Sequence, residues 1–223
     1  MRREVREHRG MRIPARILSS IVACAALAAL VACGPKPAEF VPLFNGENLD
    51  GWKMAGDAQF LVRDGCLVGT QDTGKGGDIW TEADHGDFEF RAMYKVKWPA
   101  NSGFWYRWNP ETKKGYQFDI LKHPKPVAYS GSVYCPGKLF LWTNLVESAE
   151  NRDDWNEARI WAKACHMIVW LNGKRLAEVH DMTFDKGKIG IQVHGGDGFK
   201  GMEIVAKDIR IRPVGPGEQP PTD

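Results

Sequence analysis

Hydrophobic and polar residues alternate along much of the chain between positions 40 and 214. In residues 87–97, DFEFRAMYKVK, every second side chain from position 88 onward is apolar. Alternation with period two places those side chains on one face of a β-strand. Apolar runs that meet at Asp64-Gly65 and at Asn172-Gly173 predict two tight hairpins, because both dipeptides favour turns with positive φ.

No stretch of a dozen residues shows a helical period, although residues 139–150 have room for one helical turn. Short strands without intervening helices predict an all-β fold, a two-sheet antiparallel β-sandwich of the jelly-roll type with roughly ten to fourteen strands. The pattern has no linker, so we expect one domain over residues 41–213. The predicted strands are the hairpin 60–68 and residues 87–97, 103–108, 116–121, 132–135, 158–163, 167–171, 175–180, 189–194 and 202–212.

The composition agrees with a folded, β-rich chain of 223 residues. Charged residues make up 26% and hydrophobic residues 43%, which excludes a mainly disordered chain and a protein with many membrane spans. Nine Trp and 24 Gly are the unusual counts, and they favour a fold with many turns and a sugar site lined by aromatic rings.

The charge is unevenly distributed. The first 32 residues hold six Arg and two Glu, so 24 of the 30 basic and 26 of the 28 acidic residues remain, a net charge of −2 for the rest. Such a chain has no basic field for a phosphate backbone, so we expect no nucleic-acid partner.

The N-terminal segment is typical of a bacterial secretory signal. Residues 17–32 are sixteen apolar or small residues that follow an Arg-rich start, which is short for a membrane span of roughly 20 residues. The sequence Leu30-Val31-Ala32-Cys33 resembles a lipobox, which predicts a signal peptide over 1–32, lipidation of Cys33 and a tether over 33–40. Cys33 is not followed by an Asp of the kind that retains lipoproteins in the inner membrane, so we expect the protein in the outer membrane, facing the periplasm or the cell surface. We expect the lipid to be its one attachment to the membrane. An ordinary cleaved signal is the alternative.

Three cysteines remain in the predicted domain, at Cys66, Cys135 and Cys165. Their spacing fits no zinc or redox motif, and an odd number leaves at least one free thiol. We therefore interpret them as small apolar residues with at most one disulfide among them.

Several segments, in order and over residues 41–213, resemble the 3-keto-disaccharide hydrolase domain family, formerly a domain of unknown function. The resemblance implies a concanavalin-like β-sandwich, as in lectins and glucanases, often secreted or lipid-anchored. It also implies cleavage of glycosides oxidised at carbon 3 of the sugar, and it leaves 214–223 as a disordered tail. The segments are LFNGENLDGW at 43–52, DIWT at 78–81, GDFEFR at 86–91, NSGFWYR at 101–107, GYQFDIL at 115–121, SGSVY at 130–134, WN at 155–156, VWLNG at 169–173 and IGIQVHG at 189–195.

One segment departs from the family pattern. Where the family often has GYEVQILD, this chain has Gln117, Asp119 and Lys122, so the carboxylate is displaced by two positions. Period two keeps positions 117 and 119 on the same strand face. The displaced acid is therefore compatible with activity, and equally with a noncatalytic carbohydrate-binding module on the cell surface.

A 3-keto sugar has an acidic hydrogen on carbon 2, so its glycosidic bond can be cleaved by one base and elimination. Asp119 and His194 are the candidate catalytic groups, and also the candidate ligands if a divalent metal takes part. Arg107 and Gln117 are candidate partners of the sugar oxygens, and Trp80 and Trp105 are candidate stacking surfaces. For each residue a purely structural role is the alternative.

Overall fold

A computed structural model describes residues 36–222. Within them, no helix has the length and apolar character needed to cross a membrane. The predicted signal peptide and the predicted lipidation site Cys33 lie outside the described residues.

The described residues form fifteen strands and no α-helix, which confirms the predicted all-β fold. The predicted helical turn is the 3₁₀ turn Glu147–Ala149, and a second such turn is Asp197–Phe199. The strands are β1 Val41–Pro42, β2 Trp52–Gly56, β3 Gln59–Arg63, β4 Cys66–Gln71, β5 Gly77–Thr81, β6 Phe88–Lys97, β7 Asn101–Asn109, β8 Lys114–Pro124, β9 Val127–Cys135, β10 Leu139–Asn144, β11 Asn156–Lys163, β12 His166–Leu171, β13 Lys174–His180, β14 Lys188–Val193 and β15 Met202–Pro213.

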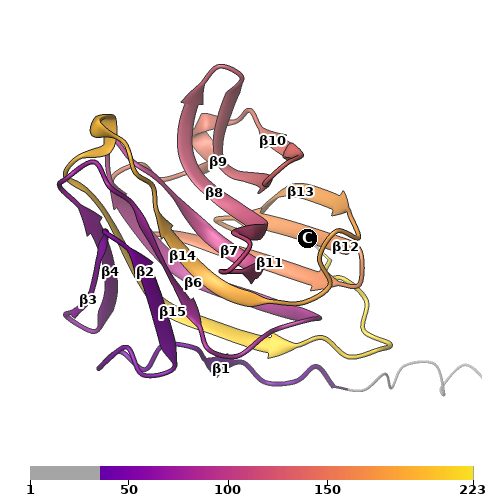
Figure 1. Cartoon of the computed structure of the whole chain (residues 1–223). Helices are drawn as coiled ribbons and strands as arrows, with labels where there is room; N and C mark the ends of the chain where they lie inside the picture. Colours follow the sequence, from indigo (N-terminus) through magenta and orange to yellow (C-terminus); the bar gives the residue numbers. More distant parts are fainter. Residues whose placement is uncertain (1–35, 223) are drawn as a thin grey trace, which may run out of the picture. The chain divides into compact units, whose positions relative to one another are not determined.

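The strands pair into two antiparallel sheets, as predicted for a sandwich (Figure 1). The eight-stranded sheet has the order β13-β12-β11-β6-β15-β4-β3, with β1 paired to β15. The seven-stranded sheet has the order β10-β9-β8-β7-β14-β5-β2. Both predicted hairpins form, and their turn residues have positive φ, 52° and 72° at Asp64-Gly65 and 53° and 75° at Asn172-Gly173.

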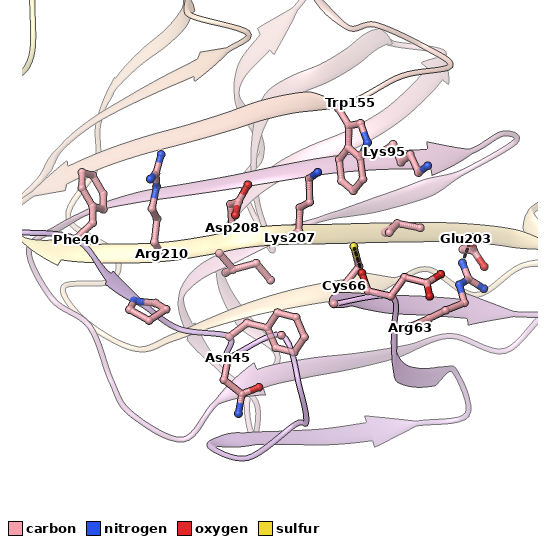
Figure 2. Close-up of a pocket in the computed structure, with 17 residues that line it drawn as sticks. Phe40, Asn45, Arg63, Cys66, Lys95, Trp155, Glu203, Lys207, Asp208 and Arg210 are labelled. Atoms are coloured by element: carbon pink, nitrogen blue, oxygen red, sulfur yellow. Dashed lines mark hydrogen bonds and ion pairs between the residues drawn. The ribbon is translucent and has the colours of Figure 1, made fainter.

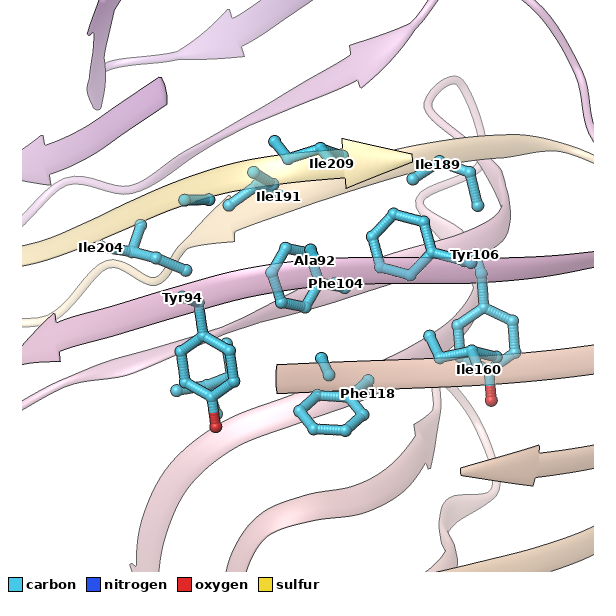
Figure 3. Close-up of a cluster of buried hydrophobic side chains, with 14 of the residues drawn as sticks. Ala92, Tyr94, Phe104, Tyr106, Phe118, Ile160, Ile189, Ile191, Ile204 and Ile209 are labelled. Atoms are coloured by element: carbon cyan, nitrogen blue, oxygen red, sulfur yellow. The ribbon is translucent and has the colours of Figure 1, made fainter. Parts of the chain in front are cut away.

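Aromatic rings from both sheets fill the space between them (Figure 3). Phe104 of the seven-stranded sheet lies 5.4 Å from Phe90 and 5.9 Å from Tyr94 of the other sheet, measured between ring centroids. Phe118, next to Phe104 on β8, lies 6.3 Å from Tyr94. These tilted and edge-on contacts are the arrangements that aromatic rings prefer.

A buried carboxylate joins three strands on the outer face of the eight-stranded sheet. Glu89 on β6 is 1% exposed and accepts hydrogen bonds from Arg91, from Arg159 on β11 at 2.8 Å and from Arg212 on β15 at 2.9 Å. Burial alone raises its pKa, but the three arginines together leave the pKa of Glu89 below its ordinary value of 4.5.

Residues 214–222, expected to be a disordered tail, lie against the eight-stranded sheet in the structure. Val214 is buried with Trp161 and Trp170. Glu218 pairs with Arg212 at 2.6 Å, and Lys163 donates to its backbone oxygen at 2.8 Å. The tail is rich in Pro and Gly, but Val214 and Glu218 have apolar and charged partners on the sheet.

The three cysteines of the domain are all free thiols. Cys135 is buried in the core, while Cys66 and Cys165 are half-buried. The fold is therefore stabilised by packing and ion pairs, without a disulfide among the described residues.

We expect Glu89→Gln to lower the free energy of unfolding by about 3 kcal/mol at neutral pH, because the variant removes the buried negative charge that Arg91, Arg159 and Arg212 share, while Arg212 keeps Glu218 as a second partner. The control is Glu203→Gln, which removes only the exposed pair with Arg63 and should cost about 1 kcal/mol or less. Denaturant unfolding measures both.

The effect of Glu89 should also depend on pH. Since its folded pKa lies below 4.5, its contribution is complete above pH 4.5 and is lost as the pH falls through the folded pKa. The stability difference between wild type and Glu89→Gln should therefore shrink in acid. A difference that stays constant or grows there would contradict the ion-pair account.

Candidate functional site

A cleft of about 420 Å³ lies on the outer face of the seven-stranded sheet. It combines carboxylates, amides and aromatic rings, which is the usual character of a small-molecule site. Six strands or their ends contribute its lining residues, which are Asp78, Asn101, Trp105, Trp108, Lys113, Gln117, Asp119, Leu121, His123, Pro126, Tyr134, Pro136, Leu139, Phe140, Gln192 and His194.

A larger cavity, of about 690 Å³, lies along β15 on the other sheet (Figure 2). Several of its charged groups already have partners on the surface. Glu203 pairs with Arg63 at 2.6 Å, and the ammonium groups of Lys95 and Lys207 lie over the ring of Trp155. None of the six predicted sugar-site residues lies there, so the smaller cleft is the candidate site.

Strand register arranges the cleft in two rows across the sheet. The first row runs from Tyr134 through Gln117, Trp105 and Gly190 to Trp80. The neighbouring row consists of the cross-strand partners Asp119, Gly103, Gln192 and Asp78. The structure therefore places Gln117 and Asp119 side by side on the cleft face, as their spacing predicts.

Asp119 is the most isolated charged group of the cleft. It is 4% exposed, and no described residue donates a hydrogen bond to its carboxylate. Burial raises the pKa of Asp119 well above its ordinary value of 3.8. Burial first, and then the charge of Asp119, also raises the pKa of nearby Tyr134. A carboxylate without a protein partner in an open cleft is available to a ligand.

The second carboxylate of the cleft is Asp78, which the sequence analysis did not assign to the site. Burial raises its pKa, while the hydrogen bond from Trp105 Nε1 and the charges of Lys113 and His194 counteract the shift. The Trp105 Nε1–Asp78 Oδ1 distance is 2.8 Å. Asp78 lies two residues before Trp80, which was predicted to face the sugar. Because side chains alternate along a strand, Asp78 lies on the same face of β5 as Trp80.

Two glutamine amides form the floor between the acids. Gln117 Nε2 donates to Gln192 Oε1 at 3.1 Å. The side chain of Gln117 lies over Gly103, where a Cβ atom would come within 2.7 Å of Gln117 Cγ. Gln192 was not among the predicted site residues, although it lies two residues before the predicted His194 and alternation therefore places it on the same face.

His194 lies at the exposed rim of the cleft, directly after β14. Its Nδ1 is hydrogen-bonded to the carbonyl oxygen of Gly195. A carbonyl oxygen only accepts, so Nδ1 carries the hydrogen and Nε2 of the neutral ring has a free lone pair. His194 can therefore accept a proton at Nε2 or, when charged, donate one.

Arg107 does not lie in the cleft, contrary to its predicted role as a clamp for the sugar. It has a φ of 48° and occupies a bulge, where β7 shifts register against both of its neighbours. Its buried guanidinium donates to the backbone oxygens of Gly86, Ala164 and Phe184, and to Asp87 at 3.2 Å. Arg107 thus joins three loops and does not contact the site.

The bulge also determines the aromatic wall. It turns Trp108 to the same face as Trp105, and the two rings stack with centroids 5.6 Å apart. Trp80 packs edge-on against Trp108 and lines an adjoining cavity of about 310 Å³. That cavity shares Asp78, Gln192 and His194 with the cleft, so the two form one continuous surface.

The residues do not form a metal centre around Asp119 and His194. Over residues 36–222, three ligand atoms from His, Cys, Asp or Glu come within 4.8 Å of one another only elsewhere, on β12 and β13. Two ligands are too few to define a site for the divalent metal considered from the sequence, so we derive no step through a metal.

The two-sheet sandwich and its aromatic, amide-lined cleft define a lectin-like β-sandwich with a carbohydrate-related function. The chain belongs to the family of the 3-keto-alpha-glucoside-1,2-lyase-like domain, which matches residues 39–212 and confirms the resemblance inferred from the motifs. No curated protein sequence matches the chain.

Solved structures support the fold. A Parabacteroides distasonis protein provisionally assigned as a glycosyl hydrolase is 21% identical, with 79% of this chain and 94% of that chain covered and a TM-score of 0.62. The carbohydrate-binding module CBM66 of Bacillus subtilis is 15% identical, with 74% and 97% covered and a TM-score of 0.57. A protein provisionally assigned as a hydrolase and a binding module thus share this architecture, and fold alone does not distinguish the two functions.

We expect Asp119→Asn to stabilise the protein at neutral pH, because it removes a buried charge that has no partner. Since the pKa of Asp119 is raised in the folded state, stability is lost as the pH rises from 3.8 through the folded pKa. The gain in melting temperature should therefore be larger at pH 8 than at pH 4.

Asp181→Asn is the matched control for this prediction. Asp181 accepts hydrogen bonds from Lys138, Tyr116 and Thr183, which lower its pKa despite partial burial. Its substitution should destabilise the protein at neutral pH. If Asp119→Asn lowers the melting temperature in the same way, Asp119 has a structural partner and the assignment is wrong.

Proposed function

We propose that this protein cleaves 3-keto-glycosides, including 3-keto-disaccharides, by proton abstraction next to the ketone, elimination and addition of water. The observation that carries the proposal is the buried, unpartnered carboxylate of Asp119 in the cleft of a domain of this family. With a neutral or fully paired residue at that position, His194 at the rim would be the one remaining candidate base of the cleft among the described residues.

The proposed chemistry needs one strong base rather than a pair of acids. Asp119 removes the hydrogen on carbon 2, and the electrons form an enolate with the ketone at carbon 3. When the ketone re-forms, a double bond arises between carbons 1 and 2 and the group on carbon 1 leaves with a proton. Water then adds at carbon 1, and a proton returns to carbon 2, which gives the free 3-keto sugar.

The spacing of the carboxylates supports this route over ordinary glycoside hydrolysis. Asp119 and Asp78 lie in one row but on strands three steps apart, about 14 Å between backbones at the usual strand spacing. Retaining hydrolases place their two acting carboxyl groups only about 5–5.5 Å apart across one bond, closer than two short Asp side chains can come from backbones at this separation. Asp78 instead has its hydrogen bond from Trp105 and suits a role in orienting the sugar.

The other residues supply binding and proton transfer. The amides of Gln117 and Gln192 suit sugar hydroxyl groups, and Trp105 with Trp108 provides the apolar surface of the site. His194 at the rim can protonate the leaving group from Nε2 when its ring is charged, because Nδ1 is engaged with the carbonyl oxygen of Gly195. Burial makes Asp119 a stronger base than an exposed aspartate, since it raises its pKa toward the working pH.

The alternative is a noncatalytic carbohydrate-binding module. The displacement of the carboxylate from the family pattern favours it, and so does the similarity in fold to CBM66. In that case the cleft binds a sugar and Asp119 accepts hydrogen bonds from hydroxyl groups without removing a proton.

We expect the wild type to release the aglycone from a 3-keto-glucoside, and Asp119→Asn to lower kcat by about 10²–10⁴-fold while the ligand still binds. The matched control is Asp208→Asn, an exposed aspartate on the other sheet, which should keep full activity. Aglycone release followed by chromatography measures the rate, and calorimetry measures binding.

The pH profile distinguishes the two candidate bases. If Asp119 is the base, the rate falls on acidification through its raised pKa, and His194→Gln keeps that acid limb. If His194 is the base, His194→Gln removes activity and Asp119→Asn does not. Binding without turnover in the wild type would support the binding module instead, and turnover undiminished in both variants would show that neither residue is the base.

We also propose that Cys33 carries a lipid anchor that places the domain in the bacterial envelope. The support is the Arg-rich start, the apolar core and the sequence Leu30-Val31-Ala32-Cys33. Cys33→Ser should release the protein from the membrane fraction or leave an unprocessed precursor, as seen by fractionation and mass spectrometry. Normal processing with unchanged membrane attachment would contradict lipidation.

A further inference from the structure

A cluster of metal-ligating side chains lies on the edge hairpin of the eight-stranded sheet, away from the sugar cleft. It consists of His166 at the start of β12, and Glu178 and His180 near the end of β13. One ligand atom from each residue lies within 4.8 Å of the other two. It is the one such group of three that residues 36–222 contain.

Strand pairing explains why these side chains meet. His166 and His180 are direct cross-strand partners in the antiparallel register of β12 and β13. Glu178 lies two residues before His180, so it points to the same face of the sheet. A tight turn at Asn172-Gly173 joins the two strands, and the register shift at Val169-Trp170 lies away from the ligands, so all three ligands lie in the paired part of one hairpin.

Two of the ligand atoms are already in contact, and the third ligand lies beside them. His166 Nε2 and Glu178 Oε1 are 2.7 Å apart, and the rings of His166 and His180 stack with centroids 4.4 Å apart. The second carboxylate oxygen of Glu178 pairs with Arg175, which orients the group and leaves Oε1 toward the histidine. A cation can therefore replace the proton shared by His166 and Glu178 with little movement of either side chain.

We propose that His166, Glu178 and His180 bind one zinc ion. Two imidazoles and one carboxylate are a typical donor set for zinc, whereas calcium and magnesium prefer oxygen ligands alone. The side chain of His166 is 23% exposed and that of Glu178 is 45% exposed, so the ion can enter and water can complete the tetrahedron. The bound ion would link the edge strand β13 to β12 and thereby stabilise the hairpin.

The test is calorimetric titration of zinc chloride into the full chain, purified without a polyhistidine tag and stripped of metal with a chelator. The wild type should bind one zinc ion that is lost in the double variant His166→Ala/His180→Ala. Glu178→Gln and His180→Ala should each weaken that binding by at least tenfold. Zinc should also raise the melting temperature of the wild type but not of the double variant.

Two further variants locate the site. Asp119→Asn and His194→Gln, in the sugar cleft, should retain the full zinc affinity. Because His166 packs edge-on against Trp161, the circular dichroism of each variant is compared with that of the wild type. If the double variant does not fold, the test is the loss of zinc affinity in the single variants Glu178→Gln and His180→Ala. Absence of one-to-one binding, unchanged binding in these variants, or loss in His194→Gln would overturn the proposal.

Discussion

The packing of aromatic rings between the two sheets is the constraint on which the rest of the structure depends. Phe104 and Phe118 of the seven-stranded sheet meet Phe90 and Tyr94 of the eight-stranded sheet at centroid distances of 5.4–6.3 Å. Replacing one such ring by alanine typically costs about 3–5 kcal/mol, so the inward side of each strand is strongly determined. Because side chains alternate, the outward side is determined with it.

Because of this constraint, the cleft consists of outward-facing residues that contribute little to the core. With Phe104 and Phe118 turned inward, Gly103, Gln117 and Asp119 must face outward on β7 and β8. The missing side chain at Gly103 gives Gln117 room to reach Gln192, and no described side chain reaches the carboxylate of Asp119. The buried charge of Asp119 is thus held in place by its neighbours in the core, and its raised pKa reflects that position.

The sequence predicts most of the fold and about half of the site, and the difference has a physical cause. Regular alternation correctly places Gln117 and Asp119 together, and the same rule extends to Asp78 and Gln192. It fails at Arg107, because the bulge there inserts one residue into β7 and turns the side chain away. No turn signal in the sequence marks that bulge. The order of the C-terminal tail likewise depends on partners that are distant in sequence, such as Arg212 and Lys163.

The departure from the family pattern becomes clearer from the strand register. In the pattern that this segment resembles, a carboxylate precedes an amide by two positions, whereas this chain has the amide at Gln117 and the carboxylate at Asp119. The exchange keeps both groups on the cleft face but moves the acid by about 6.6 Å along β8, into the row of Gly103 and Gln192. A sugar that presents carbon 2 to Asp119 must lie nearer to that row. The side chain of Gln117 lies over Gly103 and bonds to Gln192, so a sugar in that row contacts both amides beside the displaced acid, and the exchange can preserve a productive geometry for the proposed reaction.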